Sequence, residues 1–145
     1  MTMKDIAEIV ILEKELFSLP WRAEDFEREL QKNQFAHYFV AIKEGEIVGY
    51  GGVWNLYEQA QITTIGVTRR HQRLGIATQL LETMERESIK NECETCALEV
   101  RVSNLSAQAL YDKFGYIKIN VRKGYYSDNH EDAFLMMKTL GGNYE

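Results

Sequence analysis

The chain opens with helical periodicity. Apolar residues near the start recur at the helical spacings of three, four and seven, which places them on one helix face: Ile6, Ile9, Val10, Leu16 and Phe17. Asp5 and Glu8 have the spacing of a capping box, so we expect a helix over residues 5–17. The segment Ser18-Leu19-Pro20-Trp21 ends this helix. Glu24 and Asp25 suit the first turn of a helix, so we predict a second helix at 23–31.

Strand-like runs follow these helices. Residues 35–43 and 46–54 are rich in β-forming residues, and Glu44-Gly45 between them favours a two-residue hairpin. Residues 61–67 are rich in β-branched residues and predict a third strand.

Helices and strands alternate in the rest of the chain. We expect helices at 75–91 and 105–114, the latter ended by Gly115, and strands at 96–102, 116–125 and 133–138. The order ααβββαβαββ predicts an α/β (mixed α+β) fold with one mixed sheet and helices on both faces. A length of 145 residues suits a single domain over residues 1–145.

The junction between the third strand and the third helix has the most informative chemistry. Gln72-x-x-Gly75-x-Ala77 follows a strand and opens a helix, and three arginines (Arg69, Arg70 and Arg73) lie in or beside it. A helix N-terminus has free backbone amides and the positive end of the helix dipole, and both suit a pyrophosphate. Small residues such as Gly75 and Ala77 allow the pyrophosphate to come close to the backbone. An ordinary βα turn is the alternative. The spacing matches neither a dinucleotide fingerprint nor a P-loop.

Composition narrows the function classes. Hydrophobic residues make up 45% of the chain and the net charge is −5, so a nucleic-acid partner is not expected and a cationic substrate is favoured. No apolar run approaches the roughly 20 residues of a membrane span. The N-terminus lacks the apolar stretch of a signal peptide. We therefore expect a cytoplasmic protein without a membrane partner.

The cysteines and histidines predict no metal site. Cys93 and Cys96 form a C-x-x-C pair, which suits a redox motif or half of a zinc site. Structural zinc needs four ligands, and the histidines lie far apart in the sequence. We interpret the cysteines as reduced core or surface thiols, and His37 and His71 as ordinary polar residues, with His71 close to any bound phosphate.

Several separated segments together resemble the GNAT superfamily of acetyltransferases. Gln-x-x-Gly-x-Ala after a strand is similar to the family's coenzyme A pyrophosphate loop. Further segments resemble the RimI family, which acetylates the N-terminal alanine of a small-subunit ribosomal protein: Leu19–Trp21, Asn33–Phe39, Leu98–Asn104, Ala109–Tyr116, Arg122–Tyr126 and Glu131–Ala133. The similarity runs from about residue 5 to residue 138 in the expected order.

The resemblance implies a GNAT fold, with a mostly antiparallel sheet, and acetyl-CoA as co-substrate. It implies that the bulged strand end at Ile65, Gly66 and Val67 receives the thioester and the pantetheine arm. It assigns the pyrophosphate to Arg73, Leu74, Gly75, Ile76, Ala77 and Thr78, and one further coenzyme hydrogen bond to Asn104.

For the chemistry, the resemblance implies Glu99 as general base, through water, and Tyr111 as general acid. Taken without it, Glu99 is a solvent-facing or salt-bridged strand residue, with Arg101 or Arg122 as partner, and Tyr111 is a core residue. Trp21, Tyr125 and Tyr126 are candidates for the acceptor groove, with plain aromatic packing as the alternative.

The pKa of the acceptor argues for an N-terminus. An α-amine has a pKa of about 7.8 and lysine one of about 10.4, so at pH 7 about 14% of the first but only ~0.04% of the second is neutral. We predict a protein Nα-acetyltransferase acting on a ribosomal N-terminus, as a monomer or weak homodimer. Acetylation of lysine or a small amine, and a non-catalytic acetyl-CoA-binding module, are the alternatives.

Two features depart from the family pattern. Related sequences carry asparagine before the paired tyrosines, where this chain has Gly124. A glycine in a strand there would loosen it and alter substrate recognition. The N-terminal strand common in this fold is expected to be short or missing, because the first helix begins so early.

Overall fold

The computed structural model describes residues 1–141 and contains a six-stranded sheet of order β1-β2-β3-β4-β6-β5. The strands are β1 (Ala36–Lys43), β2 (Glu46–Leu56), β3 (Gln59–Val67), β4 (Thr95–Arg101), β5 (Ile117–Arg122) and β6 (Ala133–Thr139). The helices are α1 (Ile6–Leu16), α2 (Ala23–Lys32), α3 (Ile76–Lys90) and α4 (Leu105–Lys113). The predicted order of elements and the mixed, mostly antiparallel sheet are therefore confirmed.

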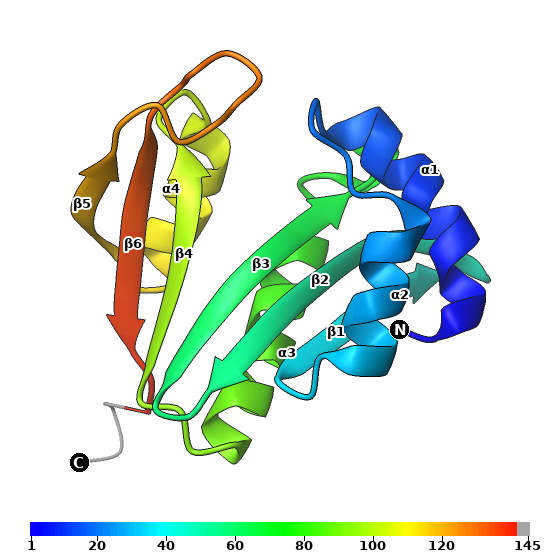
Figure 1. Cartoon of the computed structure of the whole chain (residues 1–145), viewed down its shortest axis with the longest axis horizontal. Coiled ribbons are helices and arrows are strands. Elements are labelled where there is room, and N and C mark those ends of the chain that lie inside the picture. Colours follow the sequence, from blue (N-terminus) through cyan, green and yellow to red (C-terminus); the bar gives the residue numbers. More distant parts are fainter. Residues whose placement is uncertain (142–145) are drawn as a thin grey trace.

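Helices cover both faces of the sheet (Figure 1). On one face, α1 and α2 pack on β1 and β2 around a core that includes Ile9, Phe26 and Tyr50. On the other, α3 and α4 pack on β2, β3, β4 and β6 around a second core that includes Leu81 and Tyr111. Apolar side chains on both faces of the central strands are what this three-layer arrangement requires.

Element ends differ from the sequence expectation by at most three residues. The hairpin at Glu44 and Gly45 is confirmed, and both residues have positive φ (52° and 82°), as this tight turn requires. The strand expected at 116–125 ends at Arg122, because the chain turns there instead of continuing.

The predicted capping box of α1 is wrong. The Asp5 carboxylate accepts the backbone N–H of Thr2 at 2.7 Å, within a 3₁₀ turn at Met3–Asp5. Glu8 is turned toward the sheet, where it accepts the N–H of Ile47 at 3.1 Å. The Thr2–Asp5 pair has the same spacing as the one we chose, so spacing alone could not separate them.

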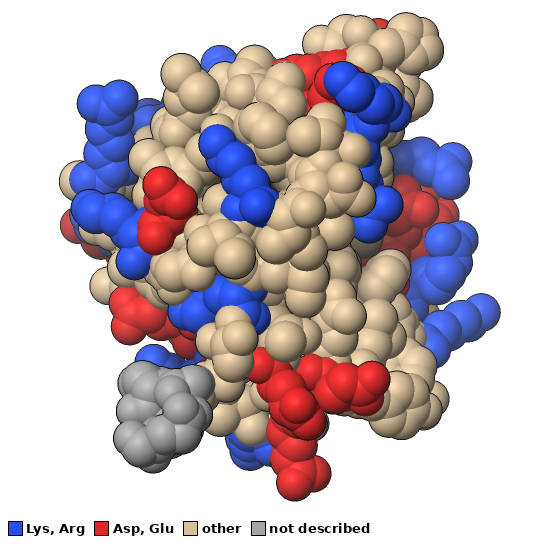
Figure 2. All heavy atoms as spheres, turned by 90° about the vertical axis from the view of Figure 1, so that its left-hand side faces the viewer, with Lys and Arg blue, Asp and Glu red and all other residues tan. Residues whose placement is uncertain are grey.

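The two sheet edges are β1 and β5. No strand precedes β1 within the described chain, in line with the expected short or missing N-terminal strand. Every residue of β5 is exposed, and Lys118 and Arg122 interrupt its apolar positions, which protects an edge against pairing with another chain. The face that includes this edge has both basic and acidic side chains, separated by uncharged surface (Figure 2).

Two further expectations from the sequence concern membrane-spanning helices and the cysteines. Among residues 1–141, no helix is both long enough and apolar enough to cross a membrane. Cys93 and Cys96 are free thiols buried in the α3/α4 core. Burial raises the pKa of the Cys96 thiol to about 12, which makes it a poor nucleophile near neutral pH.

A fork between β3 and β4 positions the site. These strands are parallel, but they pair only from Gln59 to Gln61 on β3 and from Thr95 to Ala97 on β4. Beyond that point they diverge, while β4 continues its antiparallel ladder with β6 (Figure 1). The sheet is therefore split at its centre.

Candidate active site

A cavity of about 560 Å³ occupies the fork. One wall is formed by residues 62–65 of β3 and the other by residues 98–101 of β4. The α1–α2 connection contributes Phe17, Ser18, Leu19 and Trp21. We call this space the acceptor cavity.

Backbone amides of β3 face the fork. Thr68 N–H donates to the carbonyl of Val48 on β2 at 2.9 Å. Because an antiparallel ladder alternates its bonded pairs, the polar groups of Val67 and Ile65 point away from β2, toward the open side. The Val67 carbonyl is used there by Gln72 Nε2 at 3.1 Å.

The bulge in β3 is not where it was expected. The register with β2 shifts between Gly52 and Val53, which leaves Thr63 as the extra residue on β3. The expected bulge at Ile65–Val67 is therefore wrong, because that segment stays in register with Gly49–Gly51. The free amides at Ile65 and Val67 come instead from the missing β4 partner.

A second cavity, of about 640 Å³, lies at the start of α3, and we call it the coenzyme cavity. Gly75 is the N-cap of α3 with φ +83°, and a Cβ there would meet nothing within 4 Å. Within the described chain no side chain caps this helix, whereas Asn104 caps α4 through the N–H of Ala107. The first amides of α3 are thus available for an anion.

Most residues predicted for the coenzyme lie in this cavity. Its lining includes Gly66, Val67, Arg73, Gly75, Ala77, Thr78 and Asn104. Leu74 instead points to solvent, with 57% of its surface exposed, and Ile76 packs toward Gly49. Any role of these two in phosphate binding has to come from their backbone.

Only some side chains of the basic turn at residues 69–73 line the coenzyme cavity. Arg73 lines it, whereas Arg69 donates to the carbonyl of Glu15 at 3.0 Å. His71 also lines the cavity and is hydrogen-bonded to Thr68 Oγ1 at 2.8 Å. Asn104 already uses its side-chain oxygen as the α4 cap, so its remaining polar group toward the cavity is the NH₂.

The two cavities adjoin each other. Their linings share Leu16, Phe17, Ile65, Asn104 and Tyr111. A long ligand lying against α3 and β3 can therefore present its end to the acceptor cavity.

Glu99 lines the acceptor cavity from β4. Its neighbours Leu98 and Val100 face the α3/α4 core, so alternation places the Glu99 side chain on the opposite face. Its carboxylate accepts Gln61 Nε2 at 3.0 Å and Arg122 Nε at 2.9 Å. The salt-bridged alternative is therefore also realised, with Arg122 as the partner, and these contacts fix the carboxylate's orientation.

Tyr111 reaches the fork from the other face. It projects from α4 into the second core, is 6% exposed, and packs edge-on against Tyr116 at 5.9 Å between ring centroids. It also lines both cavities. Burial, and to a lesser degree Tyr126 and Cys96, raise the pKa of Tyr111 above its usual value, so the hydroxyl stays protonated at neutral pH.

The three aromatic candidates are placed differently. Trp21 and Tyr126 line the acceptor cavity. Tyr125 is outside its lining, half exposed, and packs edge-on against Tyr126 at 5.0 Å. Trp21 also packs on Phe26 at 5.1 Å, so its aromatic packing and its cavity position coexist.

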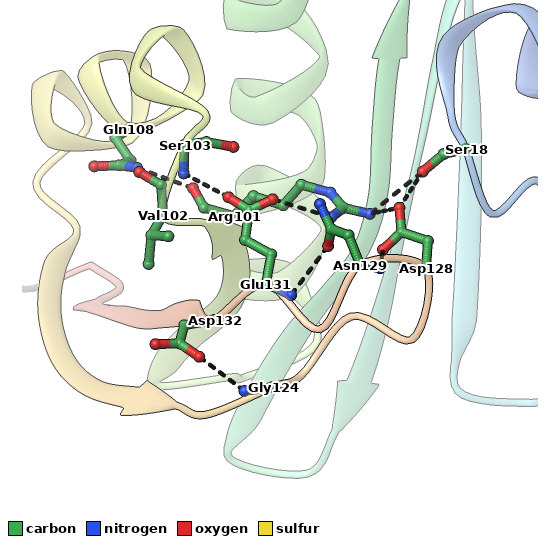
Figure 3. A network of polar contacts seen from close by, with 10 residues as sticks. All are labelled: Ser18, Arg101, Val102, Ser103, Gln108, Gly124, Asp128, Asn129, Glu131 and Asp132. Atoms are coloured by element: carbon green, nitrogen blue, oxygen red, sulfur yellow. Dashed lines mark hydrogen bonds and ion pairs between the residues drawn. The ribbon is translucent and has the colours of Figure 1, made fainter.

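A polar network that the sequence did not reveal connects the β5–β6 loop to Ser18 and Arg101, which line the acceptor cavity (Figure 3). Arg101 forms ion pairs with Asp128 at 2.9 Å and Glu131 at 3.1 Å, and its guanidinium lies 3.9 Å from the centre of the Tyr126 ring. Asp128 also accepts the Ser18 hydroxyl, which joins the β5–β6 loop to the α1–α2 connection. Ser18 and Asp128 are 110 residues apart, so no local pattern could have predicted the contact.

Position 124 lies in a turn rather than in a strand. Gly124 has φ +59° and its N–H donates to Asp132 at 2.8 Å. The expectation of a loosened strand is therefore wrong. Left-handed backbone is tolerated best by glycine and next by asparagine, which explains why either residue suits this position.

Known proteins resemble this chain in sequence and in fold. The model of the acetyltransferase (GNAT) family matches residues 6–116. A Bacillus subtilis (strain 168) protein, provisionally named a ribosomal protein bS18-alanine N-acetyltransferase, is 37% identical over 140 residues, covering 97% of this chain and 93% of that protein.

Solved structures share the fold. The ribosomal-protein-S18-alanine N-acetyltransferase of Escherichia coli superposes with a TM-score of 0.87 at 27% identity, covering 97% of this chain and 90% of that one. Arabidopsis thaliana NAA60 in complex with acetyl-CoA has a TM-score of 0.84 at 17% identity, covering 96% of this chain and 95% of that one, a likeness in fold. This chain belongs to the GNAT family and is an N-acetyltransferase.

Proposed function

We propose that this enzyme transfers the acetyl group of acetyl-CoA to the N-terminal α-amine of a protein, and that its acceptor is the N-terminal alanine of ribosomal protein bS18. The observation that carries the proposal is the meeting of two cavities at Ile65 and Tyr111, with Glu99 on the wall of one and uncapped helix amides on the wall of the other. The names of the Bacillus and E. coli proteins support the acceptor.

The coenzyme cavity fits acetyl-CoA. Its amide cradle at Gly75–Thr78 and the Arg73 side chain suit the pyrophosphate, and the open face of β3 suits the amides of the pantetheine arm. The coenzyme supplies an activated acetyl group. In this arrangement the Val67 N–H would stabilise the negative charge that develops on the acetyl oxygen.

The acceptor cavity supplies the proton transfers. The neutral acceptor amine attacks the acetyl carbon, and Glu99, through a water molecule, takes the proton that the amine nitrogen loses as the new bond forms. As the carbon–nitrogen bond forms, the carbon–sulfur bond breaks, and the Tyr111 hydroxyl donates a proton toward the departing sulfur. Solvent then restores both groups. Trp21, Tyr125 and Tyr126 would hold the first residues of the acceptor.

The test uses three peptides with acetyl-CoA: one that begins with the bS18 alanine, the same peptide with a blocked N-terminus, and the blocked peptide with an added lysine. We expect acetylation of the first alone, located by mass spectrometry. Modification of the lysine peptide at a similar rate would contradict the Nα acceptor and favour the lysine alternative. Absence of turnover with every amine would favour a non-catalytic binding module.

Replacement of Glu99 tests the proposed base. Glu99→Gln keeps the bond from Gln61 but removes the proton acceptor, so kcat should fall by about 10² to 10⁴ with the KM for acetyl-CoA little changed. Arg122→Gln is the matched control, because it removes the ion pair and leaves the carboxylate. An unchanged kcat in Glu99→Gln would exclude this residue as the base.

A further inference from the structure

A buried carboxylate lines the acceptor cavity without a part in the proposed chemistry. Glu13 lies on α1, is 3% exposed and contributes to the cavity lining. Burial raises the pKa of Glu13, and hydrogen bonds from Tyr50 and Trp21 partly offset this. Burying an ionisable side chain is costly, so its contacts need a reason.

One of these contacts holds a wall of the cavity. Glu13 Oε1 accepts the backbone N–H of Trp21 at 2.9 Å. The segment between them, residues 17–22, is neither helix nor strand and provides Phe17, Ser18, Leu19 and Trp21 to the cavity. The bond therefore fixes the far end of an irregular segment to a helix.

The other contact of Glu13 connects it to β3, which lines the coenzyme cavity. Glu13 Oε2 accepts the hydroxyl of Tyr50, a fully buried residue of β2. The Tyr50 ring and hydroxyl lie over Gly66, where an added Cβ would come within 3.1 Å of both. Gly66 lies between Ile65 and Val67, whose amides face the fork.

We propose that Glu13 is a positioning residue. By binding both Trp21 and Tyr50, it fixes the wall of the acceptor cavity at Trp21 relative to Gly66, which lies in the strand segment 65–67 that would receive the thioester. The inference rests on the proposed function, because it assigns Trp21 to the acceptor and Gly66 to the coenzyme. A carboxylate suits the task because it accepts two hydrogen bonds at once, and bonds to a charged acceptor are the stronger ones. The alternative is a stabilising contact with no effect on the acceptor.

The kinetic test compares variants with the bS18-type peptide. Glu13→Ala removes both bonds, and we expect the peptide KM to rise about tenfold or more, with the acetyl-CoA KM within about twofold of wild type, since two hydrogen bonds to a charged group are lost. Glu13→Gln can still bond to both partners and should restore most of the loss. Wild-type activity tests the proposed function, and only the difference between variants tests this inference.

Glu8→Ala is the matched control. Glu8 also lies on α1 and accepts a backbone amide, that of Ile47, but it does not line the cavity. It should leave the peptide KM unchanged. Equal effects of Glu8→Ala and Glu13→Ala on the peptide KM would reduce Glu13 to a structural contact and overturn the proposal.

Two further measurements apply even if Glu13→Ala does not fold. Tyr50→Phe cuts the link over Gly66 and leaves the Trp21 bond, so the peptide KM should rise at least threefold; an unchanged value would contradict the proposal. In a Trp54→Phe background Trp21 is the sole tryptophan. Its fluorescence should be quenched more readily by acrylamide in Glu13→Leu, whose side chain fills the site but accepts no hydrogen bond, than in Glu8→Ala, and equal quenching in the two would contradict the proposal.

Discussion

A single substitution at Tyr111 can distinguish a role in core packing from a role in catalysis, because this residue both packs in the α3/α4 core and lines the two cavities. The change is Tyr111→Phe, which deletes a single oxygen. The ring stays in the α3/α4 core, packed against Tyr116. Any effect therefore reports on the hydroxyl alone.

The structure sets the expected magnitudes. Among residues 1–141, the Tyr111 hydroxyl has no hydrogen-bond partner, so its removal orphans none, and the free energy of unfolding should change by less than about 1 kcal/mol. Deleting the whole ring in Tyr111→Ala would instead cost about 3–5 kcal/mol. Loss of a general acid should lower kcat by about 10² to 10⁴.

The assay follows release of the coenzyme thiol with a thiol reagent, beside urea unfolding of the same preparation. Burial of Cys93 and Cys96 keeps the protein's own background low. Tyr116→Phe is the control, since its hydroxyl donates to Glu85 at 2.8 Å within the same core. It should lose about 1.5 kcal/mol of stability and keep its kcat.

The two variants should thus show opposite patterns. A Tyr111→Phe enzyme that retains more than about a third of wild-type kcat would refute the general-acid role, because even a modest contribution of this kind exceeds a hundredfold. A loss of stability above about 2 kcal/mol would show instead that the hydroxyl has a structural partner.

The remaining predictions concern backbone and charge. Gly75→Ala puts a Cβ at φ +83°, so we expect about 1–2 kcal/mol lower stability by urea unfolding and a raised acetyl-CoA KM with the peptide KM unchanged. Gly124→Asn should unfold within about 0.5 kcal/mol of wild type, whereas Gly124→Val should be clearly less stable, and equal stability of the two would contradict the turn argument. The Ser18 hydrogen bond and Arg101 lower the pKa of Asp128 below its usual value of 3.8. The contribution of Asp128 to folding stability is therefore present above pH 3.8 and is lost as the pH falls below that value. The Tm values of wild type and Arg101→Gln should therefore converge on acidification below about pH 4, and a constant gap would argue against the ion pair.

Hydrophobic periodicity was sufficient to predict the order of most elements, because the helices and all the strands except the exposed β5 bury one face or both. The turn at Gly75 could also be predicted, since the glycine, the preceding strand and the basic residues lie together in the sequence. The position of the capping box could not be predicted, because Thr2–Asp5 and Asp5–Glu8 offer the same spacing and only the hydrogen bond from the Ile47 N–H to Glu8 decides between them.

The acceptor cavity was predictable only in part. Glu99 stands out as a carboxylate in an apolar strand, but its partner Gln61 depends on the β3–β4 register, which leaves no trace in the sequence. The Ser18–Asp128 contact and the Glu13–Tyr50 link join distant segments in the same way. Long-range polar contacts of this kind follow from topology, and local patterns do not encode topology.

The fork itself explains why the site lies here. A full parallel ladder between β3 and β4 would pair the amides of Ile65 and Val67 and close both cavities. With the ladder ended after Gln61, these amides need water or a ligand, because an unpaired buried backbone group is costly. A ligand that itself carries amides along an extended arm would satisfy them in the manner of an added strand, and its end would then lie between the two groups that the fork brings from opposite faces of the sheet, Glu99 and Tyr111.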